Sequence, residues 1–285
     1  FQAEDGIRDL VRSRGLGDVY KRQILDAIAS AGKGHIGGAY SCNDILVVLY
    51  YAGFLKVNPN DPLWPERDRF LLSKGHAGVG LYAILADLGF FTVDELNTLN
   101  KGSMFGEHPH HIVPGIEAVS GSLGHGLPIA TGMAIADKLD HKNRQTVVMM
   151  GDGECYEGSV WEAANFASHN ELHNLWAIVD RNGLITGGST EVINKLEPFA
   201  DKWASFGWDV FNVDAHNIEE LVALFSNLKK RNSGPPVAII ASSVKGKGVS
   251  FMEDQASWHH GGIAGENYEK ARTELMNTLN EYGEA

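Results

Sequence analysis

The sequence has few cysteines and no long apolar run. Cys42 and Cys155 are the only cysteines among 285 residues, and they form no CxxC pair. A disulfide framework is therefore not expected, and a reducing cytosol is the simplest setting. No apolar run approaches the roughly 20 residues that a membrane-spanning helix needs. The N-terminus also lacks the apolar stretch of a signal peptide.

Positive charge is also in short supply. The formal net charge is −12 with histidine counted as neutral, which argues against a protein that binds nucleic acid or an anionic membrane. Anionic small substrates are not excluded, because a bound metal ion can reverse the local field. With 44% hydrophobic residues, the chain is long enough for one large α/β domain or two small ones.

The N-terminal segment differs from the rest of the chain. Residues 1–22 show little apolar periodicity, their charges are scattered, and they resemble a translated sequencing-adapter read. The alternative is an ordinary flexible N-terminal arm. We expect a poorly ordered segment at 1–22 and one folded domain at 23–285.

Within that domain, strands alternate with helices. Short β-rich runs lie at 68–73, 146–150, 175–180, 208–213 and 237–241. Helical patterns lie at 24–31, 42–54, 79–88, 128–139, 159–169, 196–206 and 218–230, with Ser41 as the expected N-cap of the second. This alternation predicts an α/β fold, a parallel sheet with helices on both faces.

The strongest chemical signal is the triplet Gly151–Asp152–Gly153, which directly follows the β-rich run TVVMM. A turn between a strand and a helix places Asp152 at the carboxyl end of a parallel strand, where open α/β sheets bind ligands. Glycines on both sides let the backbone approach a bulky anion, and the next helix offers free N–H groups.

A second strand, LWAIVD, ends at Asp180 and leads to Asn182, about 30 residues after Asp152. Asp152, Asn182 and a backbone carbonyl just beyond can make an oxygen-only site for Mg²⁺ bridging a diphosphate. The alternative is structural: the triplet is a tight turn and Asn182 a turn former.

This pair of signals resembles the thiamine diphosphate-binding motif. The resemblance implies that Asp152 and Asn182 ligate Mg²⁺ through their side chains, and Leu184 through its carbonyl. The run GDGECYEGSVWEAANFAS is similar to transketolases in particular. The implied fold is the diphosphate-binding domain of these enzymes.

Four of the twelve histidines lie in glycine-rich or loop sequence: His35 in GKGHIGG, His76 in SKGHA, His108 in GEHP and His259 in SWHH. Their spacing does not predict a zinc site, because HxxxH and cysteine partners are absent. Neutral imidazoles can instead hydrogen-bond sugar hydroxyls and move protons near pH 7.

These segments resemble four transketolase motifs, with Ile36 where a proline is usual. The resemblance implies that His35, His76, His108 and His259 contact the donor sugar and assist proton transfer. His260 is the alternative to His259.

Further cofactor contacts follow from the same resemblance. Ser122, Leu123, Gly124 and His125 match the segment that packs on the cofactor, with His125 in place of the usual glutamine. Glu157 and Glu162 match carboxylates at the subunit interface, and either is equally well explained as an exposed acid that stabilises a helix start. With His76, Gly151, Asp152, Gly153 and Asn182, the residues of the first segment and Glu157 complete the predicted cofactor-binding set.

The implied reaction is ketol transfer from a ketose phosphate to an aldose phosphate, as in the pentose phosphate pathway, with the cofactor as electron sink. The resemblance covers residues 21–270, which match the diphosphate-binding half of a transketolase. It implies a partner subunit that binds the pyrimidine ring, in an α₂β₂ assembly. The alternatives are another thiamine diphosphate enzyme, such as a deoxyxylulose-phosphate synthase-like or sulfosugar-specific transferase, and a degenerate binding module without activity. A Rossmann dehydrogenase is disfavoured because GxGxxG does not follow a strand.

Overall fold

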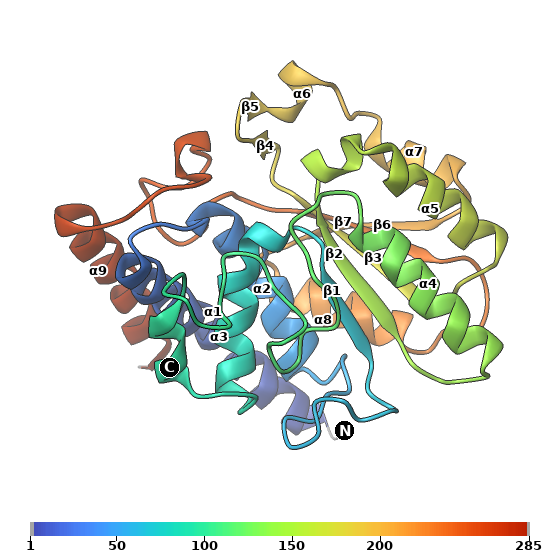
Figure 1. Cartoon of the computed structure of the whole chain (residues 1–285), viewed down its shortest axis with the longest axis horizontal. Coiled ribbons are helices and arrows are strands. Elements are labelled where there is room, and N and C mark those ends of the chain that lie inside the picture. The colour runs from blue at the N-terminus through green and yellow to red at the C-terminus, as the bar shows by residue number, and fades with distance from the viewer. Residues whose placement is uncertain (1–2, 284–285) are drawn as a thin grey trace.

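A five-stranded parallel sheet forms the centre of the computed structural model (Figure 1). The structure describes the backbone of residues 3–283 and the side chains of residues 15–280. The strands are β1 (Arg69–Leu72), β2 (Thr146–Gly151), β3 (Leu175–Arg181), β6 (Asp209–Asp214) and β7 (Val237–Ser242). They lie in the order β1-β2-β3-β7-β6, and every neighbouring pair is parallel. All five carboxyl ends therefore meet at one edge of the sheet.

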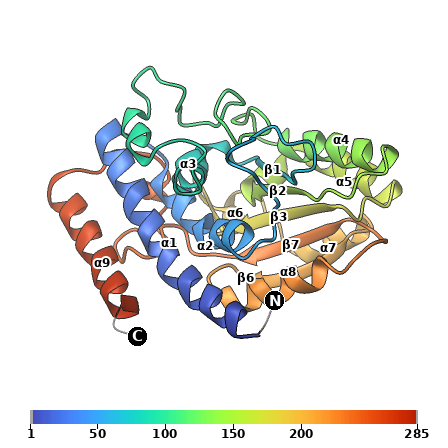
Figure 2. The same cartoon turned by 90° about the horizontal axis from the view of Figure 1, so that it is seen from below.

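Helices cover both faces of this sheet, which confirms the predicted fold class. The hydrophobic core on one face includes α1 (Ala3–Ala31), α2 (Ile36–Tyr51), α3 (Gly78–Asp87), α8 (Ile218–Leu228) and α9 (Gly265–Gly283). The core on the other face includes α4 (Gly126–Leu139), α5 (Gly158–His169) and α7 (Phe199–Ser205). Helices α1 and α9 lie side by side at the periphery (Figure 2).

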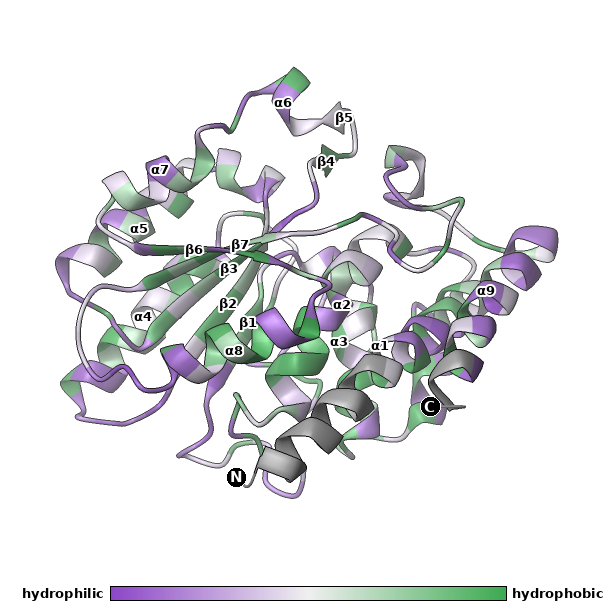
Figure 3. Cartoon of the chain, turned by 180° about the vertical axis from the view of Figure 1, so that it is seen from behind, coloured by the Kyte–Doolittle hydropathy of each residue, from purple (hydrophilic) through white to green (hydrophobic). Residues whose placement is uncertain are grey.

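Alternation along each strand divides side chains between the two cores. Val147 and Met149 of β2 belong to the first core, and Val148 and Met150 belong to the second. Because both faces are covered, the interiors of the central strands are apolar, and these strands are largely green in Figure 3. In the part of the chain that the structure describes, no helix is both long and apolar enough to cross a membrane.

Most of the short elements follow strand ends. They are the 3₁₀ turns η1 (Gly75–Ala77), η3 (Gly153–Tyr156) and η4 (Ala256–Trp258), the two-stranded pair β4 (Leu184–Ile185) and β5 (Gly188–Ser189), and α6 (Thr190–Ile193). The remaining 3₁₀ turn, η2 (Val93–Thr98), packs against α1 and α3. The β4–β5 pair follows β3 directly and stands above the sheet edge (Figure 1).

The predicted start of the second helix is wrong. Helix α2 begins at Ile36, with His35 at its N-cap position, and not at Ser41. Ser41 lies inside the helix, and its hydroxyl donates to Gly38 O and to Asp180 Oδ2 at 3.1 and 2.6 Å. Gly37 inside the helix is a close-packing position, since a Cβ there would lie 2.8 Å from Trp258 O.

The predicted disorder of residues 1–22 is wrong for the part next to the domain. Helix α1 continues through it, and Tyr20 and Lys21 are buried. Residues 1–2 lie outside the described residues. The interpretation of the segment as a translated sequencing-adapter read stays a prediction.

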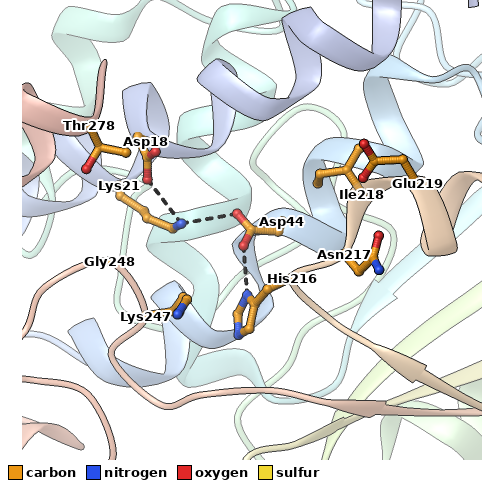
Figure 4. A pocket seen from close by; sticks show the side chains of 10 residues that line it. All are labelled: Asp18, Lys21, Asp44, His216, Asn217, Ile218, Glu219, Lys247, Gly248 and Thr278. Carbon is orange, nitrogen blue, oxygen red and sulfur yellow. Dashed lines mark hydrogen bonds and ion pairs between the residues drawn. The ribbon is translucent and has the colours of Figure 1, made fainter. Parts of the chain in front are cut away.

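A cavity of about 530 Å³ lies between α1, α2 and the start of α8 (Figure 4). Its polar side chains are paired with one another. The Lys21 ammonium lies 3.2 Å from both Asp18 Oδ1 and Asp44 Oδ1, and Asp44 Oδ2 lies 2.8 Å from His216 Nδ1. These ion pairs account for the buried charges there without a ligand.

Candidate functional site

A second cavity, of about 240 Å³, lies at the carboxyl edge of the sheet. The segments after β1, β2, β3 and β7 all contribute to it, as the parallel topology requires. Its lining consists of Lys74, His76, Leu123, Gly151, Asp152, Gly153, Glu154, Tyr156, Asn182, Leu184, Ile185, Thr186, Gly187, Lys245 and His259. Eight of the residues singled out in the sequence are among them: His76, Leu123, Gly151, Asp152, Gly153, Asn182, Leu184 and His259.

Asp152 is buried and held by three donors. Its Oδ1 accepts from the Gly153 amide at 2.8 Å, and its Oδ2 accepts from the Gly183 amide at 2.7 Å and from Arg181 Nη1 at 2.9 Å. Burial raises the pKa of Asp152 and the Asp180 carboxylate raises it further, while the Arg181 and Gly183 bonds oppose both. The carboxylate is thus fixed in direction, with lone-pair capacity left for another cation.

The β3 end supplies two more oxygen atoms. Asn182 Nδ2 donates to Asp180 Oδ2 at 3.2 Å, and Asn182 Oδ1 accepts from the Leu184 amide at 3.1 Å. The Leu184 carbonyl accepts from Lys245 Nζ at 3.1 Å. A carbonyl that already bonds an ammonium faces a position suited to a cation.

These three groups fit a magnesium ion. Asp152, Asn182 and Leu184 offer only hard oxygen ligands, they line one cavity, and one of the oxygens contacts a cation. One carboxylate and few neutral oxygens leave coordination positions for phosphate and water, which is the usual composition of a site for Mg²⁺ with a phosphate ligand.

A buried ion pair supports the floor of this cavity. The Lys74 ammonium contacts Asp180 Oδ2, and it also donates to Gly38 O at 2.8 Å. Burial raises the pKa of Asp180, but the Lys74 charge and the hydrogen bonds from Lys74, Ser243 and Ser41 together hold the pKa below its usual value. Ser243 donates to the other Asp180 oxygen, so the end of β3 is tied to the segments after β1 and β7.

The structure brings the four predicted histidines together. The His35 ring lies 5.2 Å from His76, 5.4 Å from His259 and 6.2 Å from His108, measured between ring centroids, and His76 lies 5.2 Å from His259. A fifth ring, His260, lies 4.4 Å from His35. The cluster adjoins the cavity because His76 and His259 belong to both.

Three of the clustered rings, His35, His76 and His259, are held in their neutral form. Burial, and then nearby positive charge, lowers the pKa of His259 to about 4 and that of His76 well below its usual value. Burial and the neighbouring His260 lower the pKa of His35 to about 4. His259 Nδ1 is buried and makes no hydrogen bond with the residues that the structure describes, so this ring can accept a bond from a ligand. His35 Nδ1 lies 3.1 Å from Glu107 Oε2.

Two glycines allow these rings to pack so closely. A Cβ on Gly38 would lie 3.1 Å from two atoms of the His76 ring. Gly121 has φ +128° and lies against the His108 ring, where a Cβ would come within 3.1 Å. The missing side chain of Gly38 lets α2 pack directly against the His76 ring. The contact of Gly121 with His108 also needs a backbone conformation that favours glycine.

The remaining predicted residues lie next to the cavity but do not line it. The Gly124 amide donates to Glu154 Oε1 at 2.9 Å, and Ser122 and His125 line a neighbouring small pocket. Glu157 and Glu162 are exposed at the start of α5 and on its surface.

Sequence reasoning missed several cavity residues, chiefly Lys245, Lys74 and Glu154. Burial and the Lys74 charge lower the pKa of Lys245 to about 8. The signal that could have found both lysines is their position: each follows the end of a parallel strand.

Comparisons with known proteins agree with this geometry. Residues 18–281 match the family described as transketolase, thiamine diphosphate binding domain. The chain is 41% identical over 260 residues to one of the subunits of the apulose-4-phosphate transketolase of Phocaeicola vulgatus, covering 91% of this chain and 92% of that protein. It is 42% identical over 260 residues to the 6-deoxy-6-sulfo-D-fructose transketolase subunit SqwG of a Clostridium species, covering 90% and 94%.

Longer transketolases match over part of their length. Human transketolase is 39% identical over 237 residues, which are 82% of this chain but 37% of the human protein. The crystal structure of Campylobacter jejuni transketolase superimposes with a TM-score of 0.86 at 26% identity, covering 96% of this chain and 45% of that one. The chain therefore spans less than half the length of these two proteins.

Proposed function

This chain belongs to the family of transketolase thiamine diphosphate-binding domains, and from that premise we propose that it is the diphosphate-binding subunit of a two-chain transketolase. One observation carries the proposal: the oxygen ligands Asp152, Asn182 and Leu184 share a cavity with His76 and His259. A metal–diphosphate site and a cluster of neutral imidazoles thus lie side by side, as ketol transfer requires.

In this proposal the cavity holds the diphosphate end of the cofactor. Asp152, Asn182 and the Leu184 carbonyl ligate Mg²⁺, and Gly151 and Gly153 let the phosphates approach the backbone. Lys245 adds a positive charge beside them. Ser122, Leu123, Gly124, His125 and Glu157 complete the cofactor contacts around the cavity.

The histidines act on the donor sugar. When bound, thiamine diphosphate supplies an electron sink for cleavage of the bond beside a ketose carbonyl. His35 and His259 have a pKa of about 4, so they are neutral at pH 7 and can accept a donor hydroxyl proton. His76 and His108 orient the two-carbon fragment through hydrogen bonds.

The proposal includes a partner chain in an α₂β₂ assembly. Two relatives that match this chain over more than nine tenths of their own length are named as transketolase subunits. Both cysteines are free and buried, which suits the cytosol as the proposed setting.

Part of the donor sugar is recognised by residues outside the cavity. Among the described residues that line it, the lysines are Lys74, which is paired with Asp180, and Lys245 beside the cofactor site. A distal phosphate or sulfonate on the sugar therefore needs cations from elsewhere, and we assign them to the partner. A second candidate function, transfer from a sulfosugar or from apulose 4-phosphate, is favoured by the names of the two relatives.

Reconstitution tests this proposal. The chain is assayed with Mg²⁺, thiamine diphosphate, an aldose phosphate acceptor and each donor in turn: a ketose phosphate, a sulfosugar and apulose 4-phosphate. We expect transfer only when the partner is present. Robust transfer by the chain alone would contradict the partner requirement. An assembled pair that binds no thiamine diphosphate in calorimetry would make the chain a degenerate module.

A further inference from the structure

One group of side chains in the histidine cluster is unexplained by sugar handling. His35, Glu107 and His260 present ligand atoms that all lie within 4.8 Å of one another. The closest distances join Glu107 Oε2 to His35 Nδ1, at 3.1 Å, and to His260 Nε2, at 3.6 Å. The three residues come from three separate segments, so no spacing pattern along the chain points to the group.

The backbone holds the two imidazoles beside each other. Gly34 and Gly261 form an isolated antiparallel bridge. The Gly34 amide nitrogen lies 2.9 Å from Gly261 O, and the Gly261 amide nitrogen lies 3.0 Å from Gly34 O. His35 follows the first glycine and His260 precedes the second, so they are the next pair across this bridge. Side chains of such a pair lie on the same side.

Glu107 approaches the pair from the loop between η2 and α4. Its Oε1 accepts from Asn100 Nδ2 at 3.3 Å, which leaves Oε2 directed at the two rings. Its side chain is 16% exposed, compared with 15% for His35 and 42% for His260. The group is therefore sheltered but reachable through the His260 side.

These distances match the first coordination sphere of a divalent transition metal. Metal bonds of about 2.1 Å to nitrogen and oxygen give tetrahedral ligand separations of about 3.4 Å. The two distances from Glu107 bracket that value. Rotation of the exposed His260 ring can bring the third distance, between the ligand nitrogens of His35 and His260, to the same value. His35 Nδ1 faces Glu107 Oε2, and its lone pair can bind a metal ion when that nitrogen carries no proton.

We propose that His35, Glu107 and His260 form a binding site for Zn²⁺ or a similar divalent transition metal, distinct from the oxygen-only site at Asp152. Two imidazoles and one carboxylate favour zinc, cobalt or nickel over magnesium. The remaining coordination positions are open to water or to a ligand anion. An occupied site takes His35 out of proton transfer, so the metal inhibits. This second statement rests on the proposed function, whereas metal binding does not.

Metal titration of the full chain tests the site directly. The chain is freed of metal with a chelator, and Co²⁺ is added in excess Mg²⁺ while the visible absorption spectrum is recorded. Zn²⁺ affinity is measured by competition with a chromophoric chelator. We expect one Co²⁺ per chain, and at least tenfold weaker Zn²⁺ binding in each of the variants Glu107→Gln and His260→Asn.

The matched control lies in the same loop as Glu107. His110 and His111 form a stacked pair with ring centroids 4.3 Å apart, and His111 is exposed. The variant His111→Asn should bind Zn²⁺ as the parent does. Unchanged affinity in both Glu107→Gln and His260→Asn overturns the site, as does loss of binding in His111→Asn alone. Circular dichroism of each variant separates a lost ligand from a lost fold.

Inhibition is measured on the reconstituted pair, with each variant compared to its own activity without zinc. We expect Zn²⁺ to inhibit the parent at concentrations at least tenfold below those that inhibit His260→Asn. Equal sensitivity overturns the inhibitory role. A pair that shows no transfer at all refutes the proposed function, while the Co²⁺ titration still decides the metal site.

Discussion

The substitution Asp152→Asn separates the structural role of this carboxylate from its role as a ligand. Asparagine has almost the same shape but removes the negative charge and turns one acceptor into a donor. In the structure Asp152 accepts from two backbone amides and from Arg181. An asparagine amide can satisfy only part of this set.

The expected loss of stability is about 2 kcal/mol. The main term is the charge-assisted bond from Arg181, worth about 1.5–3 kcal/mol. Removing one member of a buried ion pair costs more, about 3–5 kcal/mol, when the other charge is stranded. Arg181 is not stranded, because Glu191 Oε1 and Glu197 Oε1 lie 2.7 and 3.1 Å from its Nη2. The substitution also removes the repulsion between the carboxylates of Asp152 and Asp180, which offsets a further part of the lost stability.

Urea denaturation at pH 7 measures this effect, with Asp140→Asn at an exposed position as the control. A double-mutant cycle with Arg181→Met should give a coupling energy of about 1.5 kcal/mol. Mg²⁺ with thiamine diphosphate should stabilise the parent, by about 2.7 kcal/mol at one hundred times the dissociation constant, and should not stabilise Asp152→Asn. The reasoning is refuted if the variant loses less than about 0.5 kcal/mol and still gains the full stabilisation from the ligands.

Three further predictions follow from the same region. Lys245→Met should weaken thiamine diphosphate binding to the reconstituted pair about 10- to 100-fold in calorimetry, since one charged hydrogen bond is lost; unchanged affinity would remove Lys245 from the site. Gly38→Ala should change the free energy of unfolding by less than about 1 kcal/mol, because alanine favours the helix while its Cβ crowds His76. The same variant should lower the turnover of the reconstituted pair at least tenfold. Unaltered turnover contradicts the packing argument. Acidification from pH 7 to 5 should lower stability by about 1 kcal/mol for each of His35 and His259. Their pKa is about 4 in the folded chain and about 6.5 when unfolded, so the unfolded state takes up more protons between those values; a urea midpoint that does not fall with pH would refute this.

Much of the fold was readable from local pattern. The runs that became β2 and β3 are apolar from Val147 to Met150 and from Leu175 to Val179, which predicts strands buried on both faces of a parallel sheet. Polar residues directly after such strands must meet at one edge, so Asp152 and Asn182 could be placed near each other before any coordinates. The assignment of four histidines to one site depended on resemblance, because spacing does not bring distant loops together.

The errors have local causes. The second helix was expected to start after Ser41, but Gly37 and Gly38 already lie inside α2, where neighbouring segments pack against them too closely for a side chain. The segment before residue 23 carries a weak apolar pattern. Its burial depends on packing against α2 and α3, and the sequence of the segment alone does not predict that packing. Tyr20 shows this, since it is buried and lies 5.8 Å from Tyr51 of α2 between ring centroids.

The sequence by itself determined the parallel sheet and the edge where Asp152 and Asn182 lie, because strand period and strand ends are local properties of the chain. Only the tertiary structure decided which charges accompany them. Lys245 reaches the Leu184 carbonyl from a different strand end, and Glu107 reaches His35 and His260 from a loop far along the chain. Contacts of this kind depend on how the helices and loops pack over the sheet, and that packing is set by the whole core at once.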